Sequence, residues 1–181
     1  TYGTLRINNA GDYDYTLFST SSGAIKDQFT YTLVDGDGDS DTAVITIDVD
    51  VPVIKDDTAV VDETDMNPTD SVTDNLVTNG VVEGNGTYDV GTATSNGTPV
   101  VVGYDAPTNT YTGTVAGNDV FTLVIQSNGQ YTFTLIDTID HPDFTDHNDY
   151  LTFDFGVTAT DAQGDTADAE IHIRVYDDGP K

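Results

Sequence analysis

Residues 155–175 read FGVTATDAQGDTADAEIHIRV, and residues 29–49 read FTYTLVDGDGDSDTAVITIDV. The two stretches align without a gap. Each has a strand-like run, an Asp-x-x-Gly-Asp segment, and a second run in which apolar and polar residues alternate. Alternation at period two is typical of half-buried β-strands, and Gly and Asp favour tight turns. Each stretch therefore predicts a β-hairpin, and the duplication indicates a repeated module.

The repeat extends upstream of these hairpins. Residues 5–13, LRINNAGDY, match residues 123–131, LVIQSNGQY, although the second copy has a longer connection to its hairpin. We therefore interpret residues 1–55 as the C-terminal half of one module and residues 56–181 as a complete module. The junction between them is Lys55-Asp56-Asp57.

The remaining runs also favour strands. Thr, Val, Ile, Tyr and Phe dominate them, Gly, Asn and Asp separate them, and none has the periodicity of a helix of three turns. The fold class predicted from the residues is all-β.

The chain is strongly acidic, and one residue type carries the charge. Its 181 residues include 32 acidic and five basic residues, for a net charge of -27, and every acid except Glu63, Glu83 and Glu170 is Asp. A polyanion is not expected to bind nucleic acid, and no apolar run is long enough for insertion into a membrane. Asp is the short carboxylate used by turns and by calcium-binding loops. Its clustering predicts Ca²⁺ as the cofactor.

Four short stretches follow one another in the C-terminal part of the chain: Asp140-His-Pro142, NDYLTFDF at 148–155, VTATDAQGDTA at 157–167, and Asp177-Asp-Gly-Pro180. In this order they resemble the repeat modules of giant bacterial surface adhesins of the repeats-in-toxin (RTX) type, which are exported by type I secretion. The likeness is close over 121–180 and looser over 3–57. The first copy lacks the Asp-His-Pro segment, and the glycine-rich nonapeptide of calcium-binding β-rolls is absent.

The resemblance implies tandem immunoglobulin-like (Greek-key) β-sandwich modules, the first of them only a C-terminal half. It also implies calcium at the junctions, neighbouring modules of the same polypeptide as partners, and an extracellular location on the bacterial surface. A distal ligand would be bound through other domains.

Loops of a Greek-key sandwich alternate between its two poles, which predicts where the Asp clusters meet. The predicted junction site comprises Asp56, Asp57, Asp161 and Asp165, with Asp27, Asp62 or Glu63 and backbone carbonyls completing the oxygen ligands. A second predicted site, at the opposite pole, combines Asp140, Asp143, Asp146 or Asp149 with Asp177 or Asp178. A third, looser cation loop comprises Asp35, Asp37 and Asp39. It is not an EF-hand, because Ser40 and Thr46 replace the required Gly and Glu and no helices flank it.

Other interpretations of these residues, without a bound ion, are also open. The Asp clusters are also compatible with solvated turns, in which Asp is chosen for its backbone hydrogen bonds. The histidines, His141, His147 and His172, do not predict a zinc site, because two loop histidines and an outward strand histidine are not a ligand set. Two roles are compatible with the tyrosines of residues 80–120: contact with a ligand at the surface, or packing within the sandwich. These tyrosines are Tyr88, Tyr104 and Tyr111.

Two functions of different class fit the sequence. The first is a calcium-rigidified structural extender that spaces distal binding domains of an adhesin from the cell. The second is an adhesive module that binds a glycan or peptide directly. An enzyme is not expected, because the chain has no Cys nucleophile, no Gly-x-Ser-x-Gly elbow and no Ser/His/Asp constellation.

Overall fold

A computed structural model describes residues 2–18, 25–49, 52–142 and 149–177. These residues form strands and two short 3₁₀ turns, and none of their helices is long and apolar enough to cross a membrane. The elements are β1 (Gly3–Ile7), β2 (Tyr13–Leu17), β3 (Ile25–Val34), β4 (Ser40–Val49), β5 (Asp57–Asp62), η1 (Glu63–Asp65), β6 (Asp70–Asn75), β7 (Val81–Asp89), β8 (Thr94–Ser95), β9 (Thr98–Pro99), β10 (Val101–Asp105), η2 (Ala106–Thr108), β11 (Thr110–Val115), β12 (Asn118–Ile125), β13 (Gln130–Leu135), β14 (Tyr150–Thr160) and β15 (Thr166–Tyr176).

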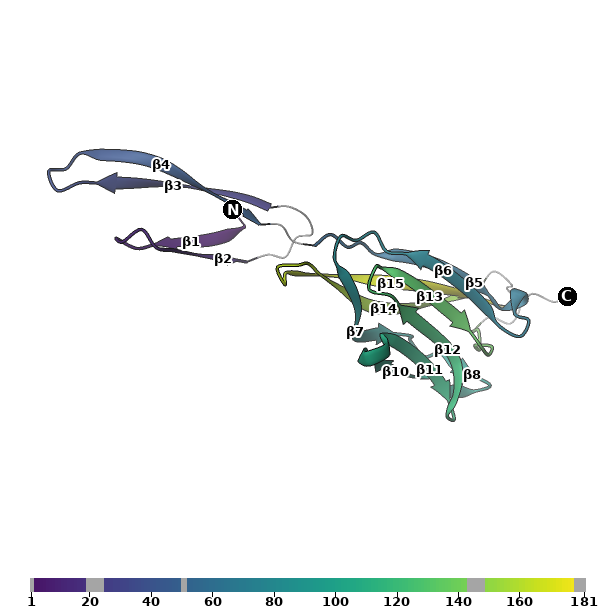
Figure 1. Cartoon of the computed structure of the whole chain (residues 1–181). Coiled ribbons are helices and arrows are strands. Elements are labelled where there is room, and N and C mark those ends of the chain that lie inside the picture. The colour runs from purple at the N-terminus through teal and green to yellow at the C-terminus, as the bar shows by residue number, and fades with distance from the viewer. Residues whose placement is uncertain (1, 19–24, 50–51, 143–148, 178–181) are drawn as a thin grey trace.

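Strands β5 to β15 form the C-terminal module, a two-layer sandwich with β8 and β9 as a separate short hairpin (Figure 1). One sheet has the order β10-β11-β12-β13-β6, and the other has the order β5-β15-β14-β7. Successive strands β5, β6 and β7 alternate between the two sheets, as in the Greek-key sandwich of immunoglobulin domains. The pairing of β5 with β15 is parallel, and β14 and β15 form an antiparallel hairpin. The predicted all-β class and sandwich are confirmed.

Aromatic side chains from both sheets fill the space between the layers. The largest fully buried ones are Tyr111, Tyr131, Phe121, Phe133, Phe153 and Phe155. The ring of Phe155, on β14, lies 5.2 Å from that of Tyr111 and 5.8 Å from that of Phe121, both on the opposite sheet. Tyr104 packs on Tyr111 with a centroid separation of 4.6 Å, so these two tyrosines belong to the packing of the sandwich.

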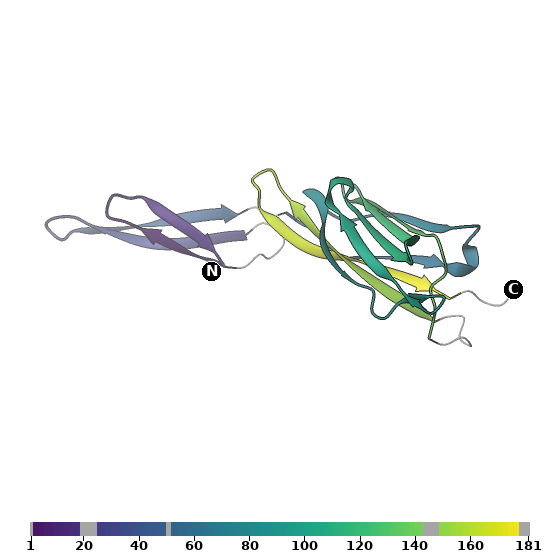
Figure 2. The same cartoon turned by 90° about the horizontal axis from the view of Figure 1, so that it is seen from below.

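Strands β1 to β4 form the N-terminal half-module, which consists of two antiparallel hairpins, β1–β2 and β3–β4. The half-module and the C-terminal module lie end to end (Figures 1 and 2). In the half-module, Gly3 and Asp27 are the buried members of the residues whose burial the structure describes, and Leu33 and Val34 are each 65% exposed. Within its described residues, the half-module therefore has no apolar core comparable to that of the sandwich.

The internal repeat is visible in the turns. In the turns 35–39 and 161–165, the N–H of the first Asp donates to the carbonyl of the last Asp, at 2.9 and 3.0 Å. The fourth residue of each turn is a glycine with a positive φ, 98° and 91°, a conformation that favours glycine. Hairpin β3–β4 is therefore the counterpart of β14–β15, as the aligned sequences predict.

Candidate metal centre

Three groups of acidic and imidazole side chains come together in the part of the chain that the structure describes. In each group, one ligand atom of every member lies within 4.8 Å of the others. The groups are Glu63, His141 and Asp177; Asp154, Glu170 and His172; and Asp35, Asp37 and Asp39.

The group of Glu63, His141 and Asp177 is the most buried of the three. Glu63 and His141 are only 6% and 3% exposed. The imidazole Nε2 lies 3.9 Å from Oε1 of Glu63, and Nδ1 lies 4.0 Å from Oδ2 of Asp149. The backbone N–H of Ile139 donates to Oε1 of Glu63 at 2.6 Å, which fixes the orientation of this carboxylate. The site thus combines an imidazole with three carboxylates.

The parallel pairing of β5 with β15 brings Glu63 to this pole. Asp57 lies opposite Ile171, at one end of the pairing, and Asp62 lies opposite Tyr176, at the other. Glu63 therefore lies beside Asp177, at the far end of β5 from the junction. Asp62 and Glu63 lie at the opposite end of β5 from Asp56 and Asp57. The prediction that Asp62 or Glu63 completes the junction site is therefore wrong.

The second predicted site is only partly assembled. Asp149 and Asp177 lie together as expected, and the N–H of Asp177 donates to the carbonyl of Asp149 at 3.1 Å. Asp143, Asp146 and Asp178 lie outside the described residues. The remaining member, Asp140, is engaged elsewhere.

Asp140 holds the short hairpin β8–β9. Its carboxylate accepts hydrogen bonds from the hydroxyl of Thr94 at 2.6 Å and from the backbone N–H groups of Gly97 and Asn96 at 2.7 and 3.1 Å. These bonds, the Thr94 bond first, lower the pKa of Asp140. Its backbone N–H also donates to the carbonyl of Thr94 at 2.7 Å. The side chain that opens the Asp-His-Pro segment thus has a structural use, and it positions the adjacent His141.

Replacing Asp140 with alanine is expected to destabilise the C-terminal module by about 2 kcal/mol, because charge-assisted hydrogen bonds contribute about 1.5–3 kcal/mol. The amides of Asn96 and Gly97 should then exchange with solvent faster. Hydrogen exchange and a urea melt measure both effects. Asp140→Asn is the matched control, because it keeps one acceptor oxygen and should lose less. Equal exchange in wild type and Asp140→Ala contradicts this role.

The structure does not bring Asp161 and Asp165 together with Asp56 and Asp57. The strand from residue 165 to residue 171, which lies opposite Asp57, is about 20 Å long in extended conformation. Oδ1 of Asp161 accepts the backbone N–H groups of Gln163 and Asp165, both at 2.9 Å, inside the turn. The prediction of a four-carboxylate cluster at the junction is therefore wrong. The turn 161–165 does lie at the pole where the half-module joins (Figure 2).

Asp56 and Asp57 each bond to the C-terminal module. Asp56 accepts the backbone N–H of Glu170 at 3.0 Å, and Asp57 accepts the hydroxyl of Tyr131 at 2.7 Å. Burial, followed by this bond to Asp57, raises the pKa of Tyr131. The two junction acids thus fasten the start of β5 to its neighbours.

Asp27 is buried in the half-module, at 3% exposure. Its carboxylate accepts the backbone N–H groups of Tyr2 and Gly3 at 2.8 and 2.9 Å and the hydroxyl of Tyr15 at 2.7 Å. Burial alone raises the pKa of Asp27, but these hydrogen bonds outweigh it and hold the pKa below its ordinary value. Asp27 therefore joins hairpin β3–β4 to hairpin β1–β2.

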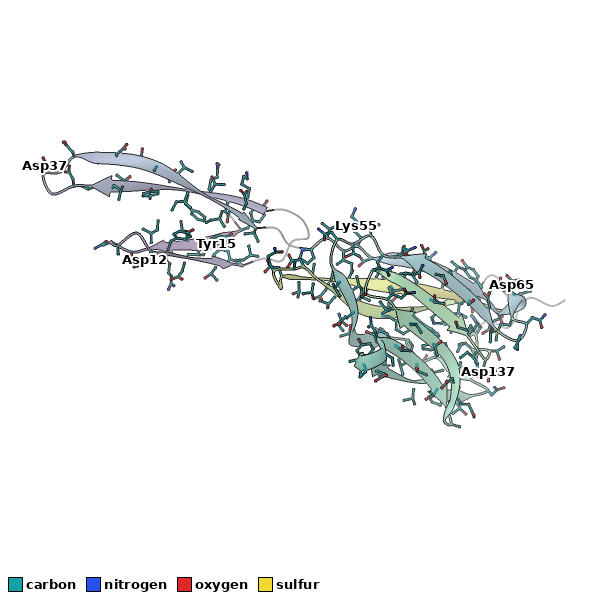
Figure 3. The ribbon with its side chains drawn as sticks, in the orientation of Figure 1. Asp12, Tyr15, Asp37, Lys55, Asp65 and Asp137 are labelled. Carbon is teal, nitrogen blue, oxygen red and sulfur yellow. The ribbon has the colours of Figure 1, made fainter. Side chains whose placement is uncertain are left out.

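The predicted loop of Asp35, Asp37 and Asp39 does assemble, at the exposed tip of hairpin β3–β4 (Figure 3). Oδ1 of Asp35 accepts the backbone N–H groups of Asp37, Gly38 and Asp39, at 3.3, 3.0 and 2.8 Å. A hydrogen bond from the Asp37 side chain, with these backbone bonds, lowers the pKa of Asp35. The arrangement offers only oxygen ligands, the kind that Ca²⁺ prefers.

Sequence reasoning did not find the group on the outer face of the four-stranded sheet. Asp154 and His172 lie opposite each other on β14 and β15, with Oδ1 and Nδ1 separated by 2.6 Å. Glu170, two residues along β15, faces the same side. Alternation along β15 predicted that His172 points outward, but only the register of the two strands reveals its partner.

Two known families match the chain, one over the half-module and the other over the C-terminal module. Residues 1–48 match the model of a bacterial Ig domain, and residues 58–174 match a family described as a domain of unknown function, DUF5801. No curated protein and no solved structure matches the chain. Since the second match covers more than half of the chain, the protein belongs to the DUF5801 family, and its N-terminal half-module is similar to a bacterial Ig domain.

Proposed function

We propose that the chain is a calcium-rigidified extender module of a large secreted bacterial surface adhesin, spacing distal binding domains from the cell. One observation carries the proposal: two Ig-type units lie end to end, with the same Asp-x-x-Gly-Asp turn at equivalent positions (Figure 1). The turn 161–165 lies at the pole of the C-terminal module that faces the half-module. By the same relationship, the turn 35–39 occupies the pole at which a preceding module would join.

Electrostatics explains why these turns would respond to calcium. Carboxylates about 4 Å apart repel one another by roughly 1 kcal/mol in water, and by about 4 kcal/mol at an effective dielectric constant near 20. A cation held by Asp35, Asp37 and Asp39 removes this repulsion. If an adjoining module supplies further oxygen ligands, the ion also fixes the angle between the two modules. An array of such junctions is stiff with calcium and flexible without it.

Calcium is expected to stabilise the chain measurably. For a Kd of about 10⁻⁴ M, typical of extracellular modules, about 1 mM Ca²⁺ adds roughly 1.4 kcal/mol per site. This corresponds to an upward shift in Tm of about 5 °C for a domain of this size. Calorimetric melts in EDTA and in CaCl₂ test the proposal, with the variant Asp35→Asn/Asp37→Asn/Asp39→Asn beside the wild type.

The Asn variant is chosen because its amide oxygens still accept the turn hydrogen bonds while the charges are removed. Its calcium-dependent shift should fall below that of the wild type. Asp12→Asn/Asp14→Asn/Asp48→Asn, which removes three charges elsewhere in the half-module, should keep the full shift. Identical melts of the wild type with and without calcium would mean that these acids serve only as turns.

The extender role has a separate test. For two copies of the chain joined in tandem, in which the turn 35–39 of the second copy adjoins the first, small-angle scattering should show a narrower range of end-to-end distances with calcium than with EDTA. An array of glycans and peptides should give no binding to the single chain. Saturable binding of a glycan or peptide to this chain would favour the adhesive-module alternative instead.

A further inference from the structure

His141 is buried, and no described residue forms a hydrogen bond with its imidazole. Its side chain is 1% exposed, and neither Nδ1 nor Nε2 has a hydrogen-bond partner in the described part of the chain. A buried polar group left without a partner costs about 1–3 kcal/mol. Such a group in a native fold indicates that something else occupies its bonding positions, either water or an ion.

The surroundings of His141 favour a cation. The carboxylates of Glu63 and Asp177 each place an oxygen within 4.8 Å of the imidazole, and Glu63 is itself buried. The distance of 3.9 Å from Nε2 to Oε1 of Glu63 is too long for a hydrogen bond. It lies, however, within the range of separations possible for two ligands of one ion. Ligands about 2.1 Å from zinc lie about 3.4 Å apart at a tetrahedral angle and at most about 4.2 Å apart.

The chemical nature of the ligand atoms indicates which cation the site would bind. Ca²⁺ and Mg²⁺ take oxygen ligands almost exclusively, whereas imidazole suits Zn²⁺ and its neighbours in the first transition row. We propose that Glu63, His141 and Asp177 bind a divalent transition-metal ion, Zn²⁺ being the probe of choice, at the C-terminal pole of this module. The site is distinct from the oxygen-only calcium turns, and it does not depend on the extender role.

Asp149 has a positioning role in this site. Its Oδ2 lies 4.0 Å from Nδ1, whereas Oε1 of Glu63 lies 3.9 Å from Nε2. A metal-bound histidine commonly donates its second ring N–H to a carboxylate, which fixes the ring and makes it a stronger ligand. Binding through Nε2 leaves the Nδ1 proton facing Asp149, so a small closure of the site completes both interactions.

The ion would tie together three separate segments of the chain. Glu63 follows β5, His141 follows β13, and Asp177 follows β15. These segments are far apart in sequence, and they end at one pole of the sandwich (Figure 1). A single ion there fixes the end from which the chain leaves the module.

Titration of the metal-free full chain with ZnCl₂ by isothermal calorimetry tests the site. We expect saturable binding that persists in 1 mM CaCl₂. His141→Gln should weaken this binding at least 100-fold. The control Asp119→Asn alters an exposed acid outside all three ligand groups, and it should leave zinc affinity unchanged. Circular dichroism melts in EDTA establish that both variants are folded.

A second measurement needs no variant of His141. X-ray absorption of the zinc-loaded wild type should show an imidazole nitrogen together with carboxylate oxygens, and Asp149→Asn should weaken binding about 10-fold while leaving the same ligand set. The proposal is overturned if zinc does not bind saturably, if 1 mM Ca²⁺ displaces it, or if His141→Gln binds it as tightly as the wild type. An oxygen-only absorption spectrum would also overturn it.

Discussion

Replacing Phe155 with alanine is expected to lower the free energy of unfolding of the C-terminal module by about 3–5 kcal/mol. Phe155 is fully buried, and its ring packs against those of Tyr111, Phe121 and Phe133, all from the opposite sheet. Its loss therefore opens a cavity between the two layers and removes contacts that hold them together. The free energy of unfolding of a domain is only about 5–15 kcal/mol. The substitution therefore removes a large part of the stability of the module.

Urea unfolding of the full chain, followed by circular dichroism, measures this loss. The matched control is Tyr150→Ala, on the same strand, because Tyr150 is 43% exposed and packs at a tilt against Tyr176 at the surface. The control should cost less than about 1 kcal/mol. A loss below 1 kcal/mol for Phe155→Ala would mean that the layers are not held by the aromatic cluster.

The hairpins could be predicted because their determinants are local. Alternation along residues 155–175, and an Asp-x-x-Gly-Asp segment with glycine at the position of positive φ, define β14, β15 and the turn between them without reference to the rest of the fold. The same pattern defines β3 and β4. Once the all-β class was clear, the inward positions of these strands followed from the alternation.

The ligand groups could not be predicted in the same way, because their members meet only through long-range pairing. Glu63 reaches Asp177 because β5 pairs in parallel with β15, a register that neither strand specifies alone. Asp140 looked like a metal ligand in sequence, yet its carboxylate bonds to the backbone of residues 96 and 97. The sequence places His141 in a loop, and the burial of its side chain becomes apparent only once the sandwich is closed.

In the turns 35–39 and 161–165, Asp has a structural use besides any binding of a cation. Asp35 and Asp161 each use a carboxylate oxygen to accept backbone N–H groups, so the reason for Asp at these positions is partly structural. Turn formation and cation binding are compatible, since each carboxylate has a second oxygen. The backbone N–H groups of residues 37–39 donate to Asp35 rather than to the carboxylates of Asp37 and Asp39, so neutralising Asp37 and Asp39 removes cation ligands while those backbone hydrogen bonds remain.

Replacing Asp27 with alanine is expected to separate the two hairpins of the half-module. Asp27 accepts hydrogen bonds from both strands of hairpin β1–β2, through the N–H of Gly3 on β1 and the hydroxyl of Tyr15 on β2. Tyr15 points from β2 toward the other hairpin, and its ring lies 6.1 Å from that of Phe29 (Figure 3). Without an apolar core to compensate, the loss of these bonds should raise hydrogen exchange across residues 3–17 at least about 10-fold.

The same contact should make the half-module sensitive to acid. Because the pKa of Asp27 is lowered on folding, its contribution to stability is fully present above its ordinary value of about 3.8 and is lost as the pH falls through the folded-state pKa. Hydrogen exchange of β1–β2, measured from pH 6 down to pH 2 and corrected for intrinsic exchange, should rise in the wild type below that value and stay flat in Asp27→Ala. Asp48→Ala, which removes an exposed ion pair with Lys26, should behave as the wild type. If exchange in Asp27→Ala matched the wild type at pH 6, the hairpins would be held together by the Tyr15–Phe29 contact instead, and Tyr15→Ala would be the variant that separates them.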